Sequence, residues 1–182
     1  MKVTVKILAC FIMFYLGAGS FAQKTLPMGY GTIKLGMSID EVKKALSADP
    51  DFGYRGDRDV SLLPGENKVL IETDTAAVAP WSYLSRCWFQ FHNEKLYIIT
   101  VNLNSEKVDH YSVFTALCKK YGDPAELSPD RSVWQNSSVR MSLERPLSLK
   151  YIDENVFAAL QKESLVDKAT NEKTRDMFLE GL

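Results

Sequence analysis

Two adjacent segments with alternating apolar residues, 83–92 and 95–104, constrain the fold of this chain most. Side chains of a β-strand point alternately to the two faces of a sheet, so each segment has one apolar face. The apolar positions are Cys87, Phe89 and Phe91 in the first segment and Tyr97, Ile99, Val101 and Leu103 in the second. Both sets can face one core only if an odd number of residues separates the two paired residues at the ends of the loop. We therefore predict an antiparallel hairpin with a three-residue loop at 92–94 or 93–95.

Further strands are predicted where the same alternation recurs. They lie at 67–73, 132–135, 139–144 and 147–152, with a short strand-like piece at 60–63. The inward positions of the last two full strands are Val139, Met141 and Leu143, and Leu147, Leu149 and Tyr151. Residues 75–80 are predicted to form a loop.

Helices are predicted before, between and after these strands. The first begins at Ser38, which forms a capping box with Glu41, and ends at Asp49 before Pro50. The second covers 109–121, and Gly122 is a suitable residue to end it. Its buried stripe would be Phe114, Leu117, Cys118 and Tyr121, which recur at helical spacing.

The order of these elements predicts an α+β fold, in which an antiparallel sheet has its helices packed on one face. Each half of the chain has a helix followed by a meander, so a degenerate tandem of two helix-plus-meander units is also consistent with the pattern. We expect one domain at 23–161. A third helix should start after Asp153, and residues 162–182 should form an exposed, charged helical tail.

The N-terminal residues 1–22 have the order of parts of a secretory signal peptide. Lys2 and Lys6 precede an uncharged apolar run at 7–18, and small residues stand at Ser20 and Ala22. The run is shorter than the roughly 20 apolar residues that a membrane span needs. Cleavage after Ala22 is favoured over lipidation at Cys10, because most of the apolar stretch follows that cysteine. We therefore expect a periplasmic or secreted protein without a stable membrane anchor.

Charge and cysteine content bear on the partners of the exported chain. The sequence has 22 basic and 23 acidic residues, and loss of Lys2 and Lys6 would lower the net charge from −1 to about −3. This balance argues against a nucleic-acid partner, which requires a clustered positive surface. In an oxidising compartment Cys87 and Cys118 are either a disulfide or two buried thiols.

The segment 33–42 (IKLGMSIDEV), with 120–124 (KYGDP) and Trp134 in the second half, resembles the SmpA/OmlA and β-lactamase-inhibitor-protein-like group. The similarity spans residues 30–152, and its motifs encode a helix cap, a helix stop and a turn. It implies a small envelope module that binds other proteins, as a scaffold for outer-membrane assembly or as an enzyme inhibitor. The chain is longer than that group's usual single unit and lacks a convincing lipobox, so no functional residue is carried over.

Catalytic chemistry finds little support in the residue pattern. A cysteine nucleophile would need His92 or His110 beside Cys87 or Cys118, and spacing along one element separates them, although cross-pairs such as Cys118 with His92 stay open. The two histidines are not spaced as metal ligands on one helix, and phosphate-binding glycine loops are absent from the sequence. We predict a protein that is not an enzyme and has no cofactor and no metal site.

Surface recognition is the function that remains. The outer face of the predicted hairpin carries Arg86, Trp88 and Gln90, with Arg140 on a neighbouring strand and Trp81 in the preceding loop as further candidates. Arginine and tryptophan are enriched at the hot spots of protein interfaces. We predict that this face binds an envelope or secreted protein.

Two alternatives stay open for this face and for the function. The tail helix or residues 51–64 would make Trp88 an ordinary core residue if they covered the face. A small-ligand carrier or sensor would instead need an apolar cavity between sheet and helices, beside Phe89 and Tyr97.

Overall fold

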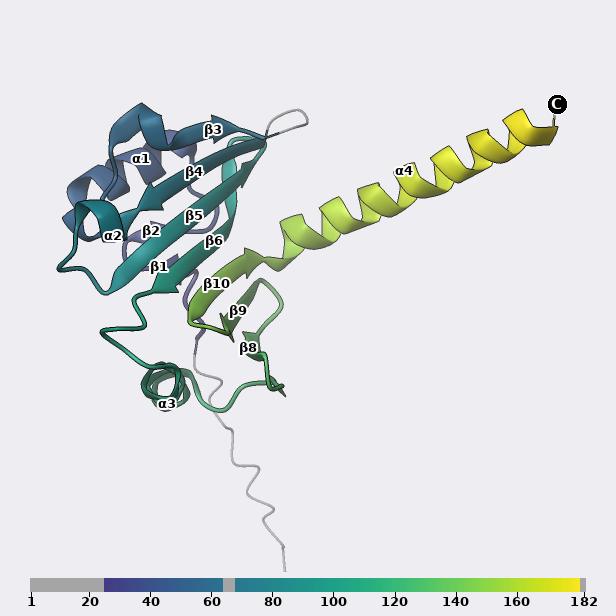
Figure 1. The fold of residues 1–182 in the computed structure, drawn as a ribbon. Helices are drawn as coiled ribbons and strands as arrows, with labels where there is room; N and C mark the ends of the chain where they lie inside the picture. The colour runs from purple at the N-terminus through teal and green to yellow at the C-terminus, as the bar shows by residue number, and fades with distance from the viewer. Residues whose placement is uncertain (1–24, 64–67, 181–182) are drawn as a thin grey trace, which may run out of the picture.

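The computed structural model describes residues 25–63 and 68–180 (Figure 1). The predicted signal peptide at 1–22 lies outside these residues. Within them, eight strands form one antiparallel sheet in the order β3-β4-β5-β6-β10-β9-β8-β7. The strands are β3 (Val60–Leu62), β4 (Lys68–Asp74), β5 (Leu84–His92), β6 (Lys95–Leu103), β7 (Glu126–Leu127), β8 (Arg131–Gln135), β9 (Val139–Glu144) and β10 (Ser148–Asp153). The predicted α+β class is confirmed.

The sheet consists of two matching units that meet at its centre. The first unit is helix α1 (Ile39–Ala48) followed by β3 to β6, and the second is helix α3 (His110–Tyr121) followed by β7 to β10. The last strands of the two units pair with each other, with Ile99 opposite Tyr151 and Val101 opposite Leu149. The predicted pair of helix-plus-meander units is therefore present in the topology.

Local sequence signals determine where both helices begin. Before α1, the Ser38 hydroxyl accepts a hydrogen bond from the Glu41 amide (3.3 Å), and the Glu41 carboxylate accepts one from the Ser38 amide (2.8 Å). Before α3, the Asp109 carboxylate accepts a hydrogen bond from the Ser112 amide (2.9 Å). Gly122, with φ of 87°, follows the last turn of α3.

The two helices differ in how deeply they are seated. Val42 and Leu46 of α1 are 0% and 1% exposed, whereas the described residues of α3 include none that is fully buried. The predicted stripe of α3 does face the core, but Phe114, Leu117, Cys118 and Tyr121 are only partly buried there. Helix α3 therefore lies less closely against the sheet than α1 does.

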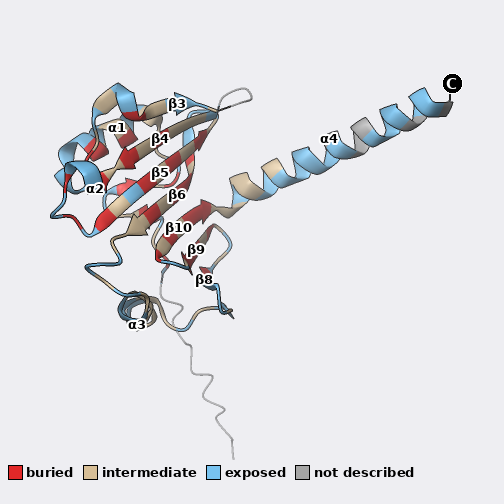
Figure 2. Cartoon of the chain, in the orientation of Figure 1, coloured by how far each residue is buried: buried red, intermediate tan, exposed pale blue. Residues whose placement is uncertain are grey.

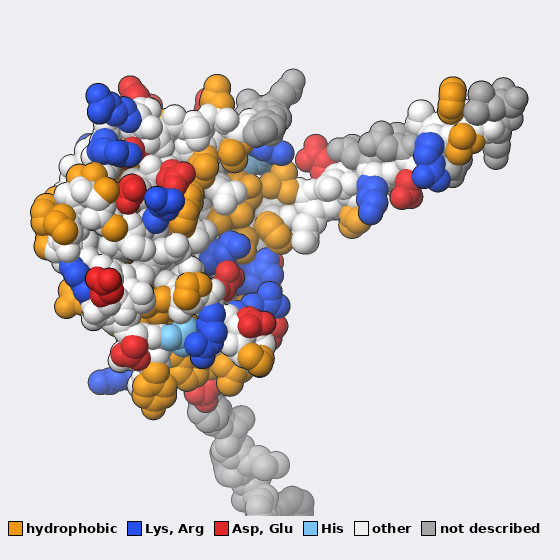
Figure 3. All heavy atoms as spheres, in the orientation of Figure 1, with side chains coloured by type: hydrophobic (Ala, Val, Ile, Leu, Met, Phe, Trp, Pro, Cys, Tyr) orange, Lys and Arg blue, Asp and Glu red, His pale blue; other side chains and the backbone are white. Residues whose placement is uncertain are grey.

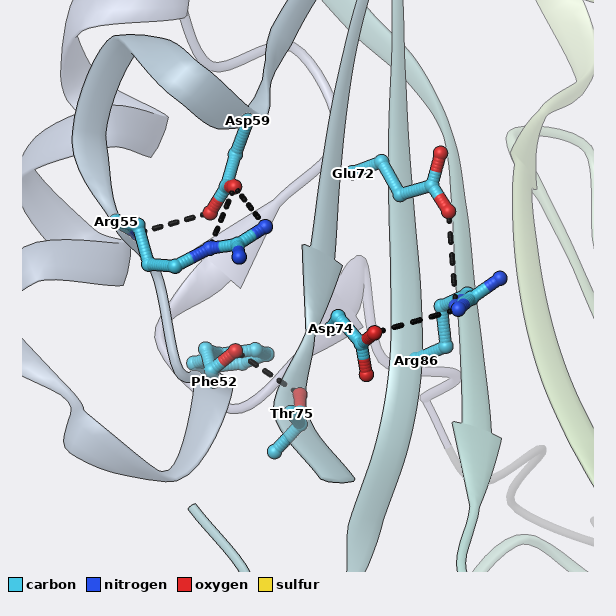
Figure 4. Close-up of polar contacts among 7 residues, drawn as sticks. All are labelled: Phe52, Arg55, Asp59, Glu72, Asp74, Thr75 and Arg86. Carbon is cyan, nitrogen blue, oxygen red and sulfur yellow. Dashed lines mark hydrogen bonds and ion pairs between the residues drawn. The ribbon is translucent and has the colours of Figure 1, made fainter. Parts of the chain in front are cut away.

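Short elements account for most of the differences from the predictions. Strands β1 (Gly29–Tyr30) and β2 (Ile33–Lys34) form a small second sheet that the sequence did not predict, and β7 was also missed. Residues 75–80 were predicted as a loop, but they begin with the short helix α2 (Thr75–Val78). The buried Thr75 hydroxyl donates a hydrogen bond to the Phe52 carbonyl (2.9 Å, Figure 4), which fixes the start of α2 against the preceding loop.

The loop before β3 contains two short 3₁₀-helices, η1 (Pro50–Phe52) and η2 (Gly56–Asp59). The Asp59 carboxylate is buried and accepts hydrogen bonds from the backbone amide and guanidinium of Arg55, at 2.8 Å in both cases (Figure 4). Burial of a carboxylate requires such pairing. Arg55 and Asp59 therefore fix the conformation of this loop.

The β5–β6 hairpin is present, but its predicted three-residue loop is wrong. His92 pairs with Lys95, which leaves the two-residue loop Asn93–Glu94, and both loop residues have positive φ (47° and 61°). A register shift then lies between the pairs Gln90–Ile98 and Phe91–Leu96. For both apolar sets to face one core, an odd number of residues must separate the paired positions. A β-bulge at Tyr97, rather than a longer loop, supplies the extra residue.

The hydrophobic core lies on the side of the sheet that α1 and the β1–β2 hairpin cover (Figures 1 and 2). The predicted inward residues of β9 (Val139, Met141 and Leu143) and of β10 (Leu149 and Tyr151) belong to this core, with Leu147. Helix α4 (Glu154–Glu180) instead projects from the end of β10 and is exposed along most of its length (Figure 2). Residues 162–180 are the distal part of this continuous helix. In the described part of the chain, no helix is long and apolar enough to cross a membrane.

Candidate functional site

The side of the sheet that carries Arg86, Trp88 and Gln90 is opposite the core, and we call it the open face. Pairing across the strands sorts its side chains into three rows. The rows are Asp74, Arg86, Asn102, Ser148, Glu144 and Arg131; Glu72, Trp88, Thr100, Lys150, Ser142 and Val133; and Leu70, Gln90, Ile98, Ile152, Arg140 and Gln135. Uncharged polar groups and backbone dominate the middle of this face in Figure 3.

The middle row brings Trp88 and Lys150 close together. Trp88 lies opposite Thr100, and Thr100 lies opposite Lys150 on the next strand. Two strand spacings separate the aromatic and basic residues, which is about 10 Å. Trp88 is partly exposed, and Lys150 has no ion pair within the described part of the chain. This row therefore presents an aromatic surface beside a cation whose charge is not neutralised by a direct partner.

Arg86 is placed on the open face but its charge is compensated locally. Its guanidinium lies 3.3 Å from the Asp74 carboxylate and 3.6 Å from that of Glu72, and Figure 4 shows it between the two. All three side chains are substantially exposed, so screening by solvent keeps these ion pairs weak. The edge of the open face at β4 and β5 is thus a mixed-charge surface.

Arg140 also lies on the open face, where it is engaged by the start of α4. Its guanidinium is 2.7 Å from the Glu154 carboxylate and 5.2 Å from the centre of the Phe157 ring. Both contacts hold the first turns of α4 against the end of the sheet. The structure therefore gives Arg140 a positioning role in the fold that the sequence pattern did not indicate.

Trp81 lies away from the other predicted contact residues, in the turn between α2 and β5. It is 62% exposed, and its indole nitrogen donates a hydrogen bond to the Asp51 carboxylate (3.2 Å). Tyr83, also 62% exposed, has the Lys107 ammonium 5.9 Å from its ring centre. The structure thus brings Arg86, Trp88, Gln90 and Arg140 onto one face and does not bring Trp81 to it.

The two segments that could have covered Trp88 lie elsewhere. Helix α4 leaves from the end of β10, and residues 50–62 lie at the β4 edge and on the core side, where the Phe52 ring packs edge-on against Phe89 with centres 6.0 Å apart. Figure 1 shows no helix of the described chain over the middle of the open face. Trp88 is consequently covered by neither segment and is partly exposed.

Neither thiol forms a disulfide in the structure. Cys87 is fully buried in β5, and burial raises its pKa to about 12, so it is a protonated core residue. Cys118 is partly buried on α3, and burial also raises its pKa. Of the two alternatives that the sequence left open, the structure has the pair of free thiols.

The cysteine–histidine pairs considered from the sequence are not brought together. His92 lies edge-on to Tyr97, with ring centres 6.2 Å apart, and no hydrogen bond joins a histidine to a cysteine among the described residues. Burial and the nearby Arg145 lower the pKa of His110, so its ring is mainly neutral at pH 7. Within the same residues, no group of three or more potential metal ligands is present.

Two large clefts border α3, whose described residues include none that is fully buried. The α3–hairpin cleft has a volume of about 480 Å³ and lies between α3, the β1–β2 hairpin and β10. A second cleft of about 740 Å³ lies between the start of α3 and the β7–β8 turn. The alternative of a small-ligand carrier required a cavity beside Phe89 and Tyr97, but Phe89 is fully buried and neither residue lines these clefts.

The α3–hairpin cleft contains residues that sequence reasoning assigned only to the core or did not consider. Tyr121 and Tyr151 were taken as inward-facing residues, whereas Tyr30 and Lys34 belong to the hairpin that was not predicted. The stripe on α3 indicated burial but could not indicate its extent. Strands of two residues have no repeating pattern that could have revealed β1 and β2.

Comparison with known proteins places this fold in a family. A family model described as the TP0088 domain matches residues 28–163, a range that holds the whole sheet and the start of α4. No curated protein matches the chain significantly, and no solved structure does. Because the match covers well over half of the 182 residues, the chain belongs to the TP0088 domain family.

Proposed function

We propose that this protein is an exported, non-catalytic module that binds another envelope or secreted protein through the open face of its sheet. The observation that carries the proposal is the row in which a partly exposed Trp88 and an unpaired Lys150 face outward from the middle of a broad sheet. Protein interfaces are enriched in such aromatic anchors, which a polar rim surrounds.

The shape of the molecule supports the same function. All of the described helices except α4 lie on the core side or at the ends of the sheet (Figure 1), and α4 meets the open face at Arg140 through its first turns. Basic groups gather over β8 to β10 in Figure 3, whereas Glu72 and Asp74 lie on β4. We infer that the partner presents an apolar contact at Trp88 and acidic groups towards Lys150.

The signal-peptide pattern at 1–22 supports work in the periplasm or outside the cell. We propose that the described domain acts there after cleavage behind Ala22. The proposed partner is accordingly an envelope or secreted protein.

Affinity capture with matched variants tests the proposed face. The immobilised chain is exposed to envelope and secreted proteins of its own source, and the retained proteins are quantified by mass spectrometry. The double variant Trp88→Ala with Arg86→Ala should weaken capture of a specific partner by about 30-fold, as loss of a hot spot does. Lys150→Glu should weaken the same capture by reversing the charge.

Trp81→Ala is the matched control, because it removes an exposed tryptophan that lies off the open face. It should leave capture unchanged. Equal capture by the Trp88→Ala, Arg86→Ala variant and the original protein would refute the proposal, provided that circular dichroism shows both to be folded. Loss of capture in Trp81→Ala alone would move the interface to the α2–β5 turn.

A further inference from the structure

The α3–hairpin cleft lies on the opposite side of the sheet from the open face. Its volume of about 480 Å³ lies within the range of roughly 300–1,000 Å³ that is typical of small-molecule sites. Its apolar lining comes from α3, β10 and the segments that flank them: Pro27, Val108, Val113, Ala116, Leu117 and Leu149. The cleft therefore offers an apolar wall that the protein itself leaves partly uncovered.

Two glycines, whose positions disfavour a side chain, belong to the hairpin beside the cleft. Gly29 and Gly31 both line the cleft. A Cβ at Gly29 would meet the Ile33 carbonyl oxygen at 2.2 Å, so a side chain cannot be added there without moving the hairpin. Gly31 has φ of 57°, a conformation that disfavours residues with a Cβ. At Gly29 and Gly31, the lining of the cleft is therefore backbone rather than side chain.

Three tyrosines supply hydroxyl groups around the apolar wall. Tyr30 and Tyr121 line the cleft with Tyr151, whose pKa is raised by burial and by the neighbouring Tyr121 and Tyr30 hydroxyls. The Tyr151 hydroxyl therefore stays protonated at physiological pH and can donate a hydrogen bond.

The charged lining residues of the cleft are both basic. The Lys34 ammonium donates a hydrogen bond to the Gly31 carbonyl (2.6 Å), and the Lys120 ammonium lies 5.2 Å from the centre of the Tyr121 ring. Among the described residues, neither ammonium pairs with a carboxylate, and the lining contains no aspartate or glutamate. The second cleft differs, because Asp109 is part of its lining and Arg131 is paired with Glu126 at 2.9 Å.

We propose that the α3–hairpin cleft binds a small amphiphile that has one apolar chain and one carboxylate head group. The chain would lie against Leu117, Val113 and Leu149, and the carboxylate would accept hydrogen bonds from the tyrosine hydroxyls and the lysine ammonium groups. Apolar walls with a few convergent donors are the usual construction of such sites. Binding would also cover the α3 stripe that the fold leaves partly exposed.

Isothermal titration calorimetry of the full chain with sodium dodecanoate, below the concentration at which it forms micelles, tests this site. Lys34→Gln with Lys120→Gln should weaken binding by at least about tenfold, because charge-assisted hydrogen bonds are lost. Dodecyltrimethylammonium has the same chain with a cationic head and should not bind measurably. Leu117→Trp should also abolish binding by filling the cleft.

Matched variants localise the ligand and separate this inference from the proposed function. Lys44→Gln with Lys68→Gln removes two exposed lysines elsewhere and should leave affinity unchanged, as should Arg145→Gln in the second cleft. The Trp88→Ala variant should bind dodecanoate with the original affinity. A negative result at one site therefore does not affect the proposal for the other site. Absence of binding, equal affinity for the cationic amphiphile, or full affinity in the Lys34→Gln, Lys120→Gln variant would each overturn the proposal.

Discussion

The two cysteines of the described chain have different surroundings, and this difference determines their reactivity. Cys87 is 0% exposed and belongs to the core, whereas Cys118 is on α3, which packs less closely against the sheet than α1 does. Alkylation requires the thiolate. Since burial raises the pKa of Cys87 to about 12, very little of its thiolate is present at pH 8.

A short pulse of iodoacetamide at pH 8 should therefore label Cys118 well before Cys87 in the folded protein. Both should react after unfolding in guanidinium chloride. Peptide mass spectrometry measures the two rates, and the unfolded sample serves as the control. Equal labelling in the folded state would contradict the structure, and protection of both thiols until dithiothreitol is added would indicate a disulfide.

Residue positions were predictable where a local rule governs them. The Ser38–Glu41 capping box and the Asp109 cap depend on neighbours three residues away, and the outward direction of Trp88 follows from strand alternation. The engagement of Arg140 by Glu154 and Phe157 depends on where α4 leaves the sheet. Sequence periodicity contains no information on that geometry.

At the scale of elements, the β5–β6 hairpin combines a tight turn with a bulge. Its two-residue loop has positive φ at both Asn93 and Glu94, the conformation of a type I′ turn. Asparagine tolerates this region because its short polar side chain can hydrogen-bond to the local backbone, whereas glutamate is unfavourable there by roughly 1 kcal/mol. The loop is therefore strained at its second position.

Glu94→Gly should relieve that strain and stabilise the protein by up to about 0.5 kcal/mol, after the larger conformational entropy of glycine in the unfolded chain is included. Glu94→Ala removes the same side chain but keeps a Cβ, so it should give no comparable gain. Urea unfolding followed by tryptophan fluorescence measures both variants. A gain in stability of the same size in Glu94→Ala would show that the effect comes from removing the glutamate charge.

Long elements were predictable and short ones were not. Strands such as β5, β6 and β9 contain enough alternating residues to show a period of two, and α1 has both a cap and a stop. Elements such as β1, β2 and β7 have two residues each, so no period exists to detect. Their positions result from packing against the sheet.

At the scale of the molecule, α4 is attached to the domain by its first turns. Arg140 contacts Glu154 and Phe157, but Leu165, Val166, Met177, Phe178 and Leu179 are each more than half exposed. The expected boundary between residues 161 and 162 therefore falls within a continuous helix. The distal helix adds little buried apolar area to the core.

Removal of residues 162–182 should leave the free energy of unfolding within about 0.5 kcal/mol of its original value, as changes remote from the core usually do. Helical circular dichroism at 222 nm should fall. Arg140→Ala in the full chain is the contrasting variant, because it leaves the Glu154 carboxylate without its partner and should destabilise the protein more than the truncation does. A large loss of stability on truncation would mean that the distal helix contacts the domain.

The order of strands in the sheet could not be predicted from the sequence. Alternation shows which side chains of a strand face the core, but it does not show which strands pair with each other. The repeated helix and meander did indicate two similar units. That their last strands, β6 and β10, meet at the centre could not be read from the order of elements, since pairing of the first strands would have satisfied the same pattern.

The central β6–β10 pairing also determines when the sheet can be completed during synthesis. The strand β10 is the last to emerge, so until then the nine-residue β6 has one edge of unpaired amide and carbonyl groups. Such an edge pairs readily with any extended segment. The finished molecule hides this long edge in its middle and leaves only β3 and β7, of three and two residues, at the rims of its described sheet. The finished sheet thereby pairs both edges of its long strand β6 and ends in two short strands.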